Sequence, residues 1–135
     1  MSYMNDETEN YLEGIRQWII EALDDAKAEN ILELDIRPFT QIADWMVVAS
    51  GTSTRHVMAL AEKVRESGVK HSLKPIGVEG ESEGEWVLLD FGDVIVHLMV
   101  PATREFYDLE GLWNERLGLQ LSRARGQQVE DSTEA

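Results

Sequence analysis

The chain has 135 residues, with 26 Asp and Glu against 12 Lys and Arg, so its formal charge is −14. Phosphate backbones are bound by clustered cations, and the basic residues here are scattered, which argues against direct binding of nucleic acid. With 43% apolar and 28% charged residues, the composition is that of one globular domain. The absence of cysteine excludes disulfides, thiolate metal sites and cysteine nucleophiles, and it fits the cytosol.

The first third of the chain predicts a helix followed by two strands. Residues 1–8 are polar and are expected to be flexible, whereas residues 9–28 carry apolar side chains at the three- and four-residue spacing of an amphipathic helix. Residues 31–36 have the length of a strand, and the apolar run 45–49 indicates a strand covered on both faces. The acidic start of the chain lacks the apolar stretch of a signal peptide, and no apolar run is long enough to span a membrane.

The rest of the chain predicts a second helix, three strands and a short third helix. A helical stripe begins after N-cap candidates around Ser53 and ends at Gly68. Strand-like segments follow at residues 74–78, 85–91 and 94–100, with a tight Gly-Asp hairpin between the last two. A helical segment begins at Pro101, and residues 121–135 lack periodicity and are predicted to be a disordered tail.

This order of elements predicts a single α/β domain over residues 9–120, with a mixed sheet of about five strands flanked by helices. The second strand, the second helix and the third strand form a natural right-handed crossover. The last three strands form a meander, which makes the sheet mixed.

Most of the negative charge lies in two stretches. Residues 1–30 hold eight acidic and two basic residues, which a solvated helix face and a polar terminus explain. Residues 79–93 hold six acidic residues and no basic one, and they surround Trp86. Two interpretations of this second stretch stay open: acidic groups that keep a strand edge from pairing, and a docking surface for a basic protein.

The sequence lacks the common signatures of catalytic and metal sites. It has no P-loop, no dinucleotide-binding glycine motif, no zinc-protease motif and no nucleophile elbow, and its three histidines lie far apart. His97 lies inside an apolar strand and is expected to be a hydrogen-bonded structural residue, whose pKa burial would lower and nearby carboxylates would raise. We therefore predict no catalytic residue, no cofactor and no metal.

Two features nevertheless resemble parts of a metal-dependent nucleotidyltransferase. The segment 50–53 lies between a strand and a helix, where free N–H groups can bind an anion. Asp90 and Asp93 bracket a hairpin and could bind a divalent cation. Helix capping and turn formation explain both features more simply, so this enzyme is kept only as an alternative.

Three sets of residues form recognisable motifs. They are residues 43–53 (ADWMVVASGTS) with 55–57; Glu79-Gly80 with residues 86–97 (WVLLDFGDVIVH); and Arg104, Tyr107, Leu109-Glu110 and Leu112-Trp113. In this order, over about residues 10–115, they resemble the signatures of the ribosomal silencing factors, the Iojap-like family. The WVLLD-x-GDVIVH string is the most specific of them.

The resemblance implies a mixed α/β domain that is distantly similar to nucleotidyltransferases but lacks their active site. It also implies a cytoplasmic regulator that binds the large ribosomal subunit through its fourteenth ribosomal protein, which is basic. Bound there, such a factor would block subunit joining and repress translation when nutrients are short, whereas organelle relatives are associated with large-subunit assembly. Trp45 stands where relatives often carry a smaller aromatic, and the residues beyond about 117 are expected to have no counterpart in the family.

The chemistry of the residues and the resemblance both indicate a docking face. Aromatic anchors supply binding energy, while charged rims steer a partner of opposite charge. The predicted partner-binding residues are Glu79, Glu85, Trp86, Asp90, Asp93, Tyr107 and Glu110. Core packing is the alternative role for Trp86 and, more so, for Trp113. A homodimer off the ribosome is a further possibility, and neither sequence-specific nucleic acid nor a membrane is an expected partner.

Overall fold

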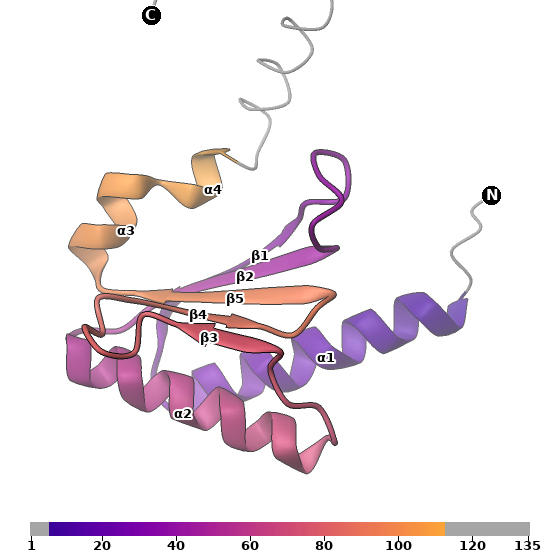
Figure 1. The fold of residues 1–135 in the computed structure, drawn as a ribbon, viewed down its shortest axis with the longest axis horizontal. Coiled ribbons are helices and arrows are strands. Elements are labelled where there is room, and N and C mark those ends of the chain that lie inside the picture. The colour runs from indigo at the N-terminus through magenta and orange to yellow at the C-terminus, as the bar shows by residue number, and fades with distance from the viewer. Residues whose placement is uncertain (1–5, 113–135) are drawn as a thin grey trace, which may run out of the picture.

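The computed structural model describes residues 6–112 (Figure 1). Its elements in chain order are α1 (Asp6–Asp25), β1 (Glu29–Asp35), β2 (Trp45–Ser50), α2 (Thr54–Lys70), β3 (Gly77–Glu79), β4 (Trp86–Asp90), β5 (Val94–Met99), α3 (Pro101–Tyr107) and α4 (Leu109–Leu112). This order confirms the predicted sequence of helices and strands. The predicted domain end at residue 120, the predicted tail and Trp113 lie outside the described residues.

Several element boundaries differ from the prediction by a few residues. Helix α1 covers Asp6–Asp25 rather than residues 9–28, so residues 6–8, which were expected to be flexible, are helical. Helix α2 continues past Gly68 to Lys70; the glycine is needed for the fold-back that follows, because a Cβ there would lie 2.3 Å from the Leu73 carbonyl oxygen. Strand β3 begins at Gly77 rather than residue 74, since Pro75 has no N–H to donate to a ladder. The last helical segment is split at Asp108, whose φ of 49° ends α3.

The described strands form one mixed sheet in the order β1-β2-β5-β4-β3. β2 and β5 are parallel, and all other neighbours are antiparallel, so β3, β4 and β5 form the predicted meander. The crossover through α2 joins two parallel strands as predicted, but β5 and β4 lie between them. The predicted hairpin is present: Gly92 has a φ of 89°, and its N–H donates to Asp90 Oδ1 at 2.8 Å.

The two faces of the sheet are covered differently (Figure 1). α1 and α2 pack on one face over the larger core, which includes Val47, Ala49, Leu89 and Val96. On the other face α3, α4 and the loop of residues 36–44 surround a smaller cluster, centred on Met46, Val48 and Met99. Strand β2 is therefore buried on both faces, as its unbroken apolar run predicted. No helix within residues 6–112 is long and apolar enough to cross a membrane.

Candidate functional site

Trp86 lies on the side of the sheet that carries the smaller cluster. Its indole Nε1 donates a hydrogen bond to His97 Nδ1 at 2.9 Å, from β4 to the neighbouring strand β5. His97 is only 6% exposed, and this burial lowers its pKa to about 4, so the imidazole is neutral at pH 7. The expectation of a hydrogen-bonded structural histidine is confirmed, and burial is the dominant effect on its pKa.

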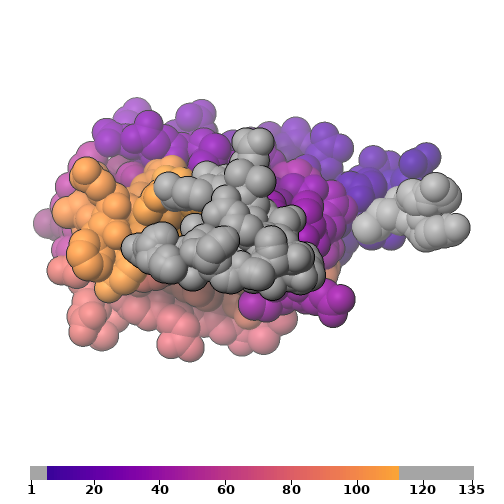
Figure 2. Space-filling model, turned by 90° about the horizontal axis from the view of Figure 1, so that it is seen from above, coloured from indigo at the N-terminus to yellow at the C-terminus, as the bar shows by residue number. Residues whose placement is uncertain are grey.

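An aromatic cluster rises from Trp86 toward solvent. The Tyr107 ring lies 4.8 Å from the Trp86 ring, and Phe106 meets Tyr107 edge-on at 4.9 Å. Exposure increases along the series, because Trp86 is half-buried, Tyr107 is 50% exposed and Phe106 is 79% exposed. Helices α3 and α4 form one end of the face seen in Figure 2, where they are orange. Trp86 thus contributes to the core and to the base of a surface cluster.

Phe106 belongs to this surface, although it was not among the predicted partner-binding residues. Two adjacent aromatics on a helix point about 100° apart, so Phe106 and Tyr107 cannot both enter one core. The sequence alone could therefore have indicated that one of these two aromatic side chains is exposed. Glu105, the neighbour of Phe106, is also exposed, but it lines a separate hollow with Arg104 and Ser50.

Two acidic residues lie close to the Trp86 end of the aromatic cluster. Glu85 is exposed and adjoins the start of α3, because its carbonyl oxygen accepts a hydrogen bond from Val100 N at 3.0 Å. Glu79 is exposed and is held near Trp86 by the next residue: Gly80 has a φ of 87°, and a Cβ there would lie 2.0 Å from the Trp86 carbonyl oxygen. We define the candidate docking surface, called the docking surface below, as Glu79, Glu85, Trp86, Phe106 and Tyr107.

Asp90 and Asp93 lie at the other end of the sheet from this docking surface. Asp90 is four residues along β4 from Trp86, or about 13 Å in an extended strand. Its carboxylate accepts from Gly92 N and shapes the hairpin. The Asp93 carbonyl oxygen accepts from Asp44 N at 2.9 Å and Trp45 N at 3.0 Å. Burial and then the charge of Asp93 raise the pKa of Asp44.

Glu110 faces inward to an arginine. Arg104 Nε donates to Glu110 Oε2 at 2.9 Å, and Arg104 Nη1 donates to the Asn30 carbonyl oxygen at 2.7 Å and to Ser50 Oγ at 3.0 Å. The arginine thereby ties α3 and α4 to the ends of β1 and β2. The Arg and Glu of the third motif therefore have a structural role, and Glu110 is not part of the exposed rim.

The two halves of the alternative nucleotidyltransferase site do not meet. Ser50 pairs with Met99 at one end of β2, whereas Asp93 lies at the Trp45 end, five residues or about 16 Å away. Within residues 6–112 no group of three His, Asp or Glu residues is placed to hold a metal ion.

The segment 50–53 is occupied by capping contacts. Ser53 Oγ accepts from His56 N at 3.1 Å and caps α2, while Thr52 N donates to His56 Nδ1 at 2.9 Å. The other imidazole nitrogen, Nε2, donates to the Ala26 carbonyl oxygen at 2.8 Å. Capping and turn formation are therefore what these residues do in the structure, as the simpler interpretation had it.

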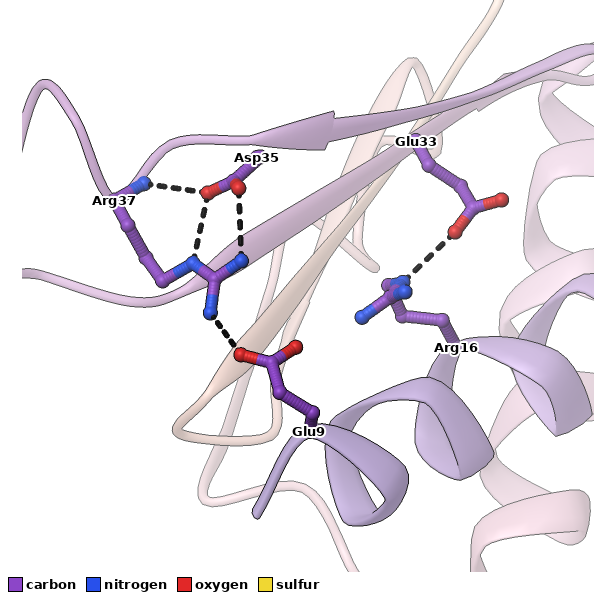
Figure 3. A network of polar contacts seen from close by, with 5 residues as sticks. All are labelled: Glu9, Arg16, Glu33, Asp35 and Arg37. Carbon is purple, nitrogen blue, oxygen red and sulfur yellow. Dashed lines mark hydrogen bonds and ion pairs between the residues drawn. The ribbon is translucent and has the colours of Figure 1, made fainter. Parts of the chain in front are cut away.

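Trp45 lies between two arginines on the face of the sheet that carries α1 and α2, opposite to Trp86. The guanidinium carbon of Arg16 lies 3.6 Å from the centre of its ring system, and that of Arg37 lies 5.4 Å away. Arg37 makes a two-pronged ion pair with Asp35 and a 2.7 Å contact with Glu9, as Figure 3 shows. These contacts fasten α1 to the strands, and the hydrogen bond from Arg37 lowers the pKa of Asp35.

The fold and the docking surface define a small α/β protein that presents aromatic and acidic side chains on one face of a mixed sheet. A family model described as "Ribosomal silencing factor during starvation" matches residues 9–135. The chain therefore belongs to the ribosomal silencing factor family, which confirms the resemblance of its motifs. The match extends to residue 135, so the expectation that residues beyond about 117 have no counterpart in the family is wrong.

Individual relatives agree with this assignment. Ribosomal silencing factor RsfS of Chromobacterium violaceum is 45% identical over 102 residues, covering 76% of this chain and 84% of the relative. A crystal structure of a Chromobacterium violaceum protein has a TM-score of 0.73 at 41% identity, covering 87% of this chain and 89% of that one. The mouse protein named mitochondrial assembly of ribosomal large subunit protein 1 is 35% identical over 102 residues, covering 73% of this chain and 44% of its own length.

Proposed function

We propose that this protein binds the large ribosomal subunit through a basic ribosomal protein, the fourteenth of that subunit, and so prevents the small subunit from joining. Under nutrient limitation this would repress translation. In this proposal the protein works in the cytoplasm as a steric blocker, without catalysis. The support for it is the family membership together with the docking surface.

The observation that carries the proposal is the exposed aromatic cluster with its acidic surroundings. Phe106 leaves most of its ring in water, and burying such a side chain contributes about 2 kcal/mol to binding. Tyr107 and Trp86 support it from below, so the cluster is preorganised and little side-chain entropy is lost on binding. The neighbouring carboxylates of Glu79 and Glu85 favour a basic partner.

Co-sedimentation with purified large subunits tests the docking surface. Phe106→Ala should weaken binding by tenfold or more without lowering the melting temperature, because the ring is exposed in the free protein. Val69→Ala is the matched control, since it removes an exposed apolar side chain from α2 on the other side of the sheet. Equal binding by both variants would refute the assignment of the surface.

The charge contribution is tested separately. Glu85→Lys should slow association, and the on-rate of the unchanged protein should fall as salt rises. Glu62→Lys makes the same charge change at an exposed position of α2 and should have a much smaller effect. A salt-independent on-rate would remove electrostatic steering from the mechanism.

The blocking step needs its own experiment. Sucrose gradients of mixed subunits should show more free subunits when the protein is added, and Phe106→Ala should lose this effect. An unchanged profile at saturating protein would contradict the block even if the large subunit is bound.

A role in large-subunit assembly is the second candidate, favoured by the name of the mouse relative. It would use the same docking surface but act on unfinished particles. Cells lacking the protein would then accumulate large-subunit precursors during rapid growth. If blocking of subunit joining is the main role, such cells would instead hold normal particles, with too many joined ribosomes under starvation.

A further inference from the structure

A groove with a volume of about 580 Å³ lies between α1 and the segment that follows α2. Tyr11, Ile15 and Trp18 line it from α1, and His71 and Leu73 line it from the other side. The Trp18 and His71 rings are stacked 5.1 Å apart and nearly parallel, so one wall is rigid. α1 and α2 lie on the sheet face opposite to α3 and α4 (Figure 1), so this groove is distinct from the docking surface.

Gly14 lies in this groove and is not required by the fold. Glycine is among the least favourable residues in the interior of a helix, and Gly14 is well inside α1. A Cβ at this position would meet no atom within 4 Å, and the residue does not have a positive φ. Neither packing within the described chain nor backbone conformation therefore explains it. Because Gly14 has no side chain, the helix backbone is accessible to a molecule that approaches along the groove.

The charges around the groove indicate what it accepts. Glu21 lines it, and Glu7 and Glu13 lie one helical turn from other lining residues of α1. None of the three has an ion-pair partner within residues 6–112. No described residue that lines the groove is Lys or Arg.

A smaller hollow of about 240 Å³ lies past the Trp18–His71 pair, which it shares with the groove. It is lined by two basic residues, Lys63 and Lys70, and by three acidic residues, Glu21, Asp25 and Glu66. Acidic side chains therefore outnumber basic ones around both hollows, and because no Lys or Arg lines the groove itself, a cation is favoured there. There the half-exposed ring of Tyr11 offers both an apolar and a cation–π contact.

From these observations we infer that the groove is a second interaction surface, which binds a segment of another protein carrying an apolar side chain next to Lys or Arg. The apolar side chain enters over Gly14, between Tyr11 and Trp18, and the cations pair with the carboxylates of α1. Because the groove and the docking surface lie on opposite sides of the sheet, both can be occupied at once. The inference does not depend on the partner proposed for the docking surface.

Selection from a displayed library of random twelve-residue peptides tests this inference on the full chain. Wild-type protein should enrich peptides with an apolar residue flanked by Lys or Arg. Gly14→Leu fills the groove and should bind those peptides at least tenfold more weakly. Glu21→Lys should also bind them more weakly, because it removes a carboxylate that would pair with their cations. Failure to enrich any peptide, enrichment of acidic peptides, or equal binding to Gly14→Leu would overturn the inference.

Thermal melting separates loss of binding from loss of folding. Because position 14 has open space and alanine is the better helix former, Gly14→Ala should raise the melting temperature by roughly 3 to 6 °C. Gly14→Leu should melt no lower than wild type. A markedly lower melting temperature for Gly14→Ala would show that the fold requires this glycine and would remove the main support for the inference.

Two further measurements define the occupant. Gly14→Leu should co-sediment with large subunits as well as wild type does, since the docking surface is untouched; loss of co-sedimentation would show that the two surfaces are not separate. Light scattering over a range of concentrations should give the same mass for wild type and Gly14→Leu. A larger wild-type mass that the substitution abolishes would mean that a second copy occupies the groove, against the inference.

Discussion

The buried hydrogen bond between Trp86 and His97 makes the stability of the protein depend on pH. The imidazole accepts the indole N–H through Nδ1, which requires that nitrogen to be unprotonated. Protonation turns Nδ1 into a donor, so the bond is lost and a charge is left in a site that is 6% exposed. Acidification thus perturbs the base of the docking surface without any mutation.

The size and sign of the effect follow from the pKa of His97. Burial lowers it from 6.5 to about 4, so between these values the unfolded chain binds a proton that the folded chain does not. The contribution of His97 to the free energy of unfolding is therefore fully present above pH 6.5, and it is lost as the pH drops toward 4. At about 1.4 kcal/mol per pH unit, the loss is about 2 kcal/mol at pH 5 and roughly 3 kcal/mol at pH 4.

Urea unfolding at pH 7.5, 6.5 and 5.0, with wild type and His97→Gln, measures this loss. Glutamine can still accept the indole N–H but does not titrate, so the variant should show little loss over this range. Because the chain carries −14 charges, acidification also relieves repulsion, and the variant can even gain stability. If wild type and variant lose equal stability between pH 7.5 and 5.0, His97 is not the responsible group and the reasoning fails.

Three substitutions test other parts of the structure by urea unfolding at pH 7.5. Gly80→Ala should lower the free energy of unfolding by about 2 kcal/mol, because φ is 87° and the methyl group would meet the Trp86 carbonyl oxygen; an unchanged value would contradict that contact. Arg104→Ala should lower the free energy of unfolding by about 2 kcal/mol, since it leaves Glu110 without its ion pair. Adding Glu110→Gln to this variant should restore part of the lost stability. Ser53→Ala should cost about 1 kcal/mol through loss of the N-cap of α2, whereas Ser53→Asp should retain most of the stability.

Helices and strands were predictable here because their signals are local. The apolar spacing of α1 and the unbroken apolar run of β2 each reflect the period of one element and need no knowledge of its neighbours. Where a local signal misled, the residue had another role in the structure. Gly68 is typical of a helix end, yet α2 continues through it to Lys70, and the missing side chain leaves room for the Leu73 carbonyl oxygen where the chain turns back.

The docking face was only partly accessible to sequence reasoning. Trp86, Tyr107, Glu79 and Glu85 do lie in one region. Asp90 is only four residues from Trp86 in the sequence, but both lie on the extended strand β4, so Asp90 lies at the opposite end of the sheet.

The sequence by itself determined the elements of the chain, its α/β class and, through its motifs, its family, since periodicity and short signatures are properties of neighbouring residues. Only the tertiary structure decided which acidic residues share a surface. The −14 charge divides into carboxylates around the aromatic cluster, carboxylates such as Glu110 that are internal partners of an arginine, and the acidic side of α1 beside the groove. Strand order and register make that division, because they bring together residues that are far apart in the chain.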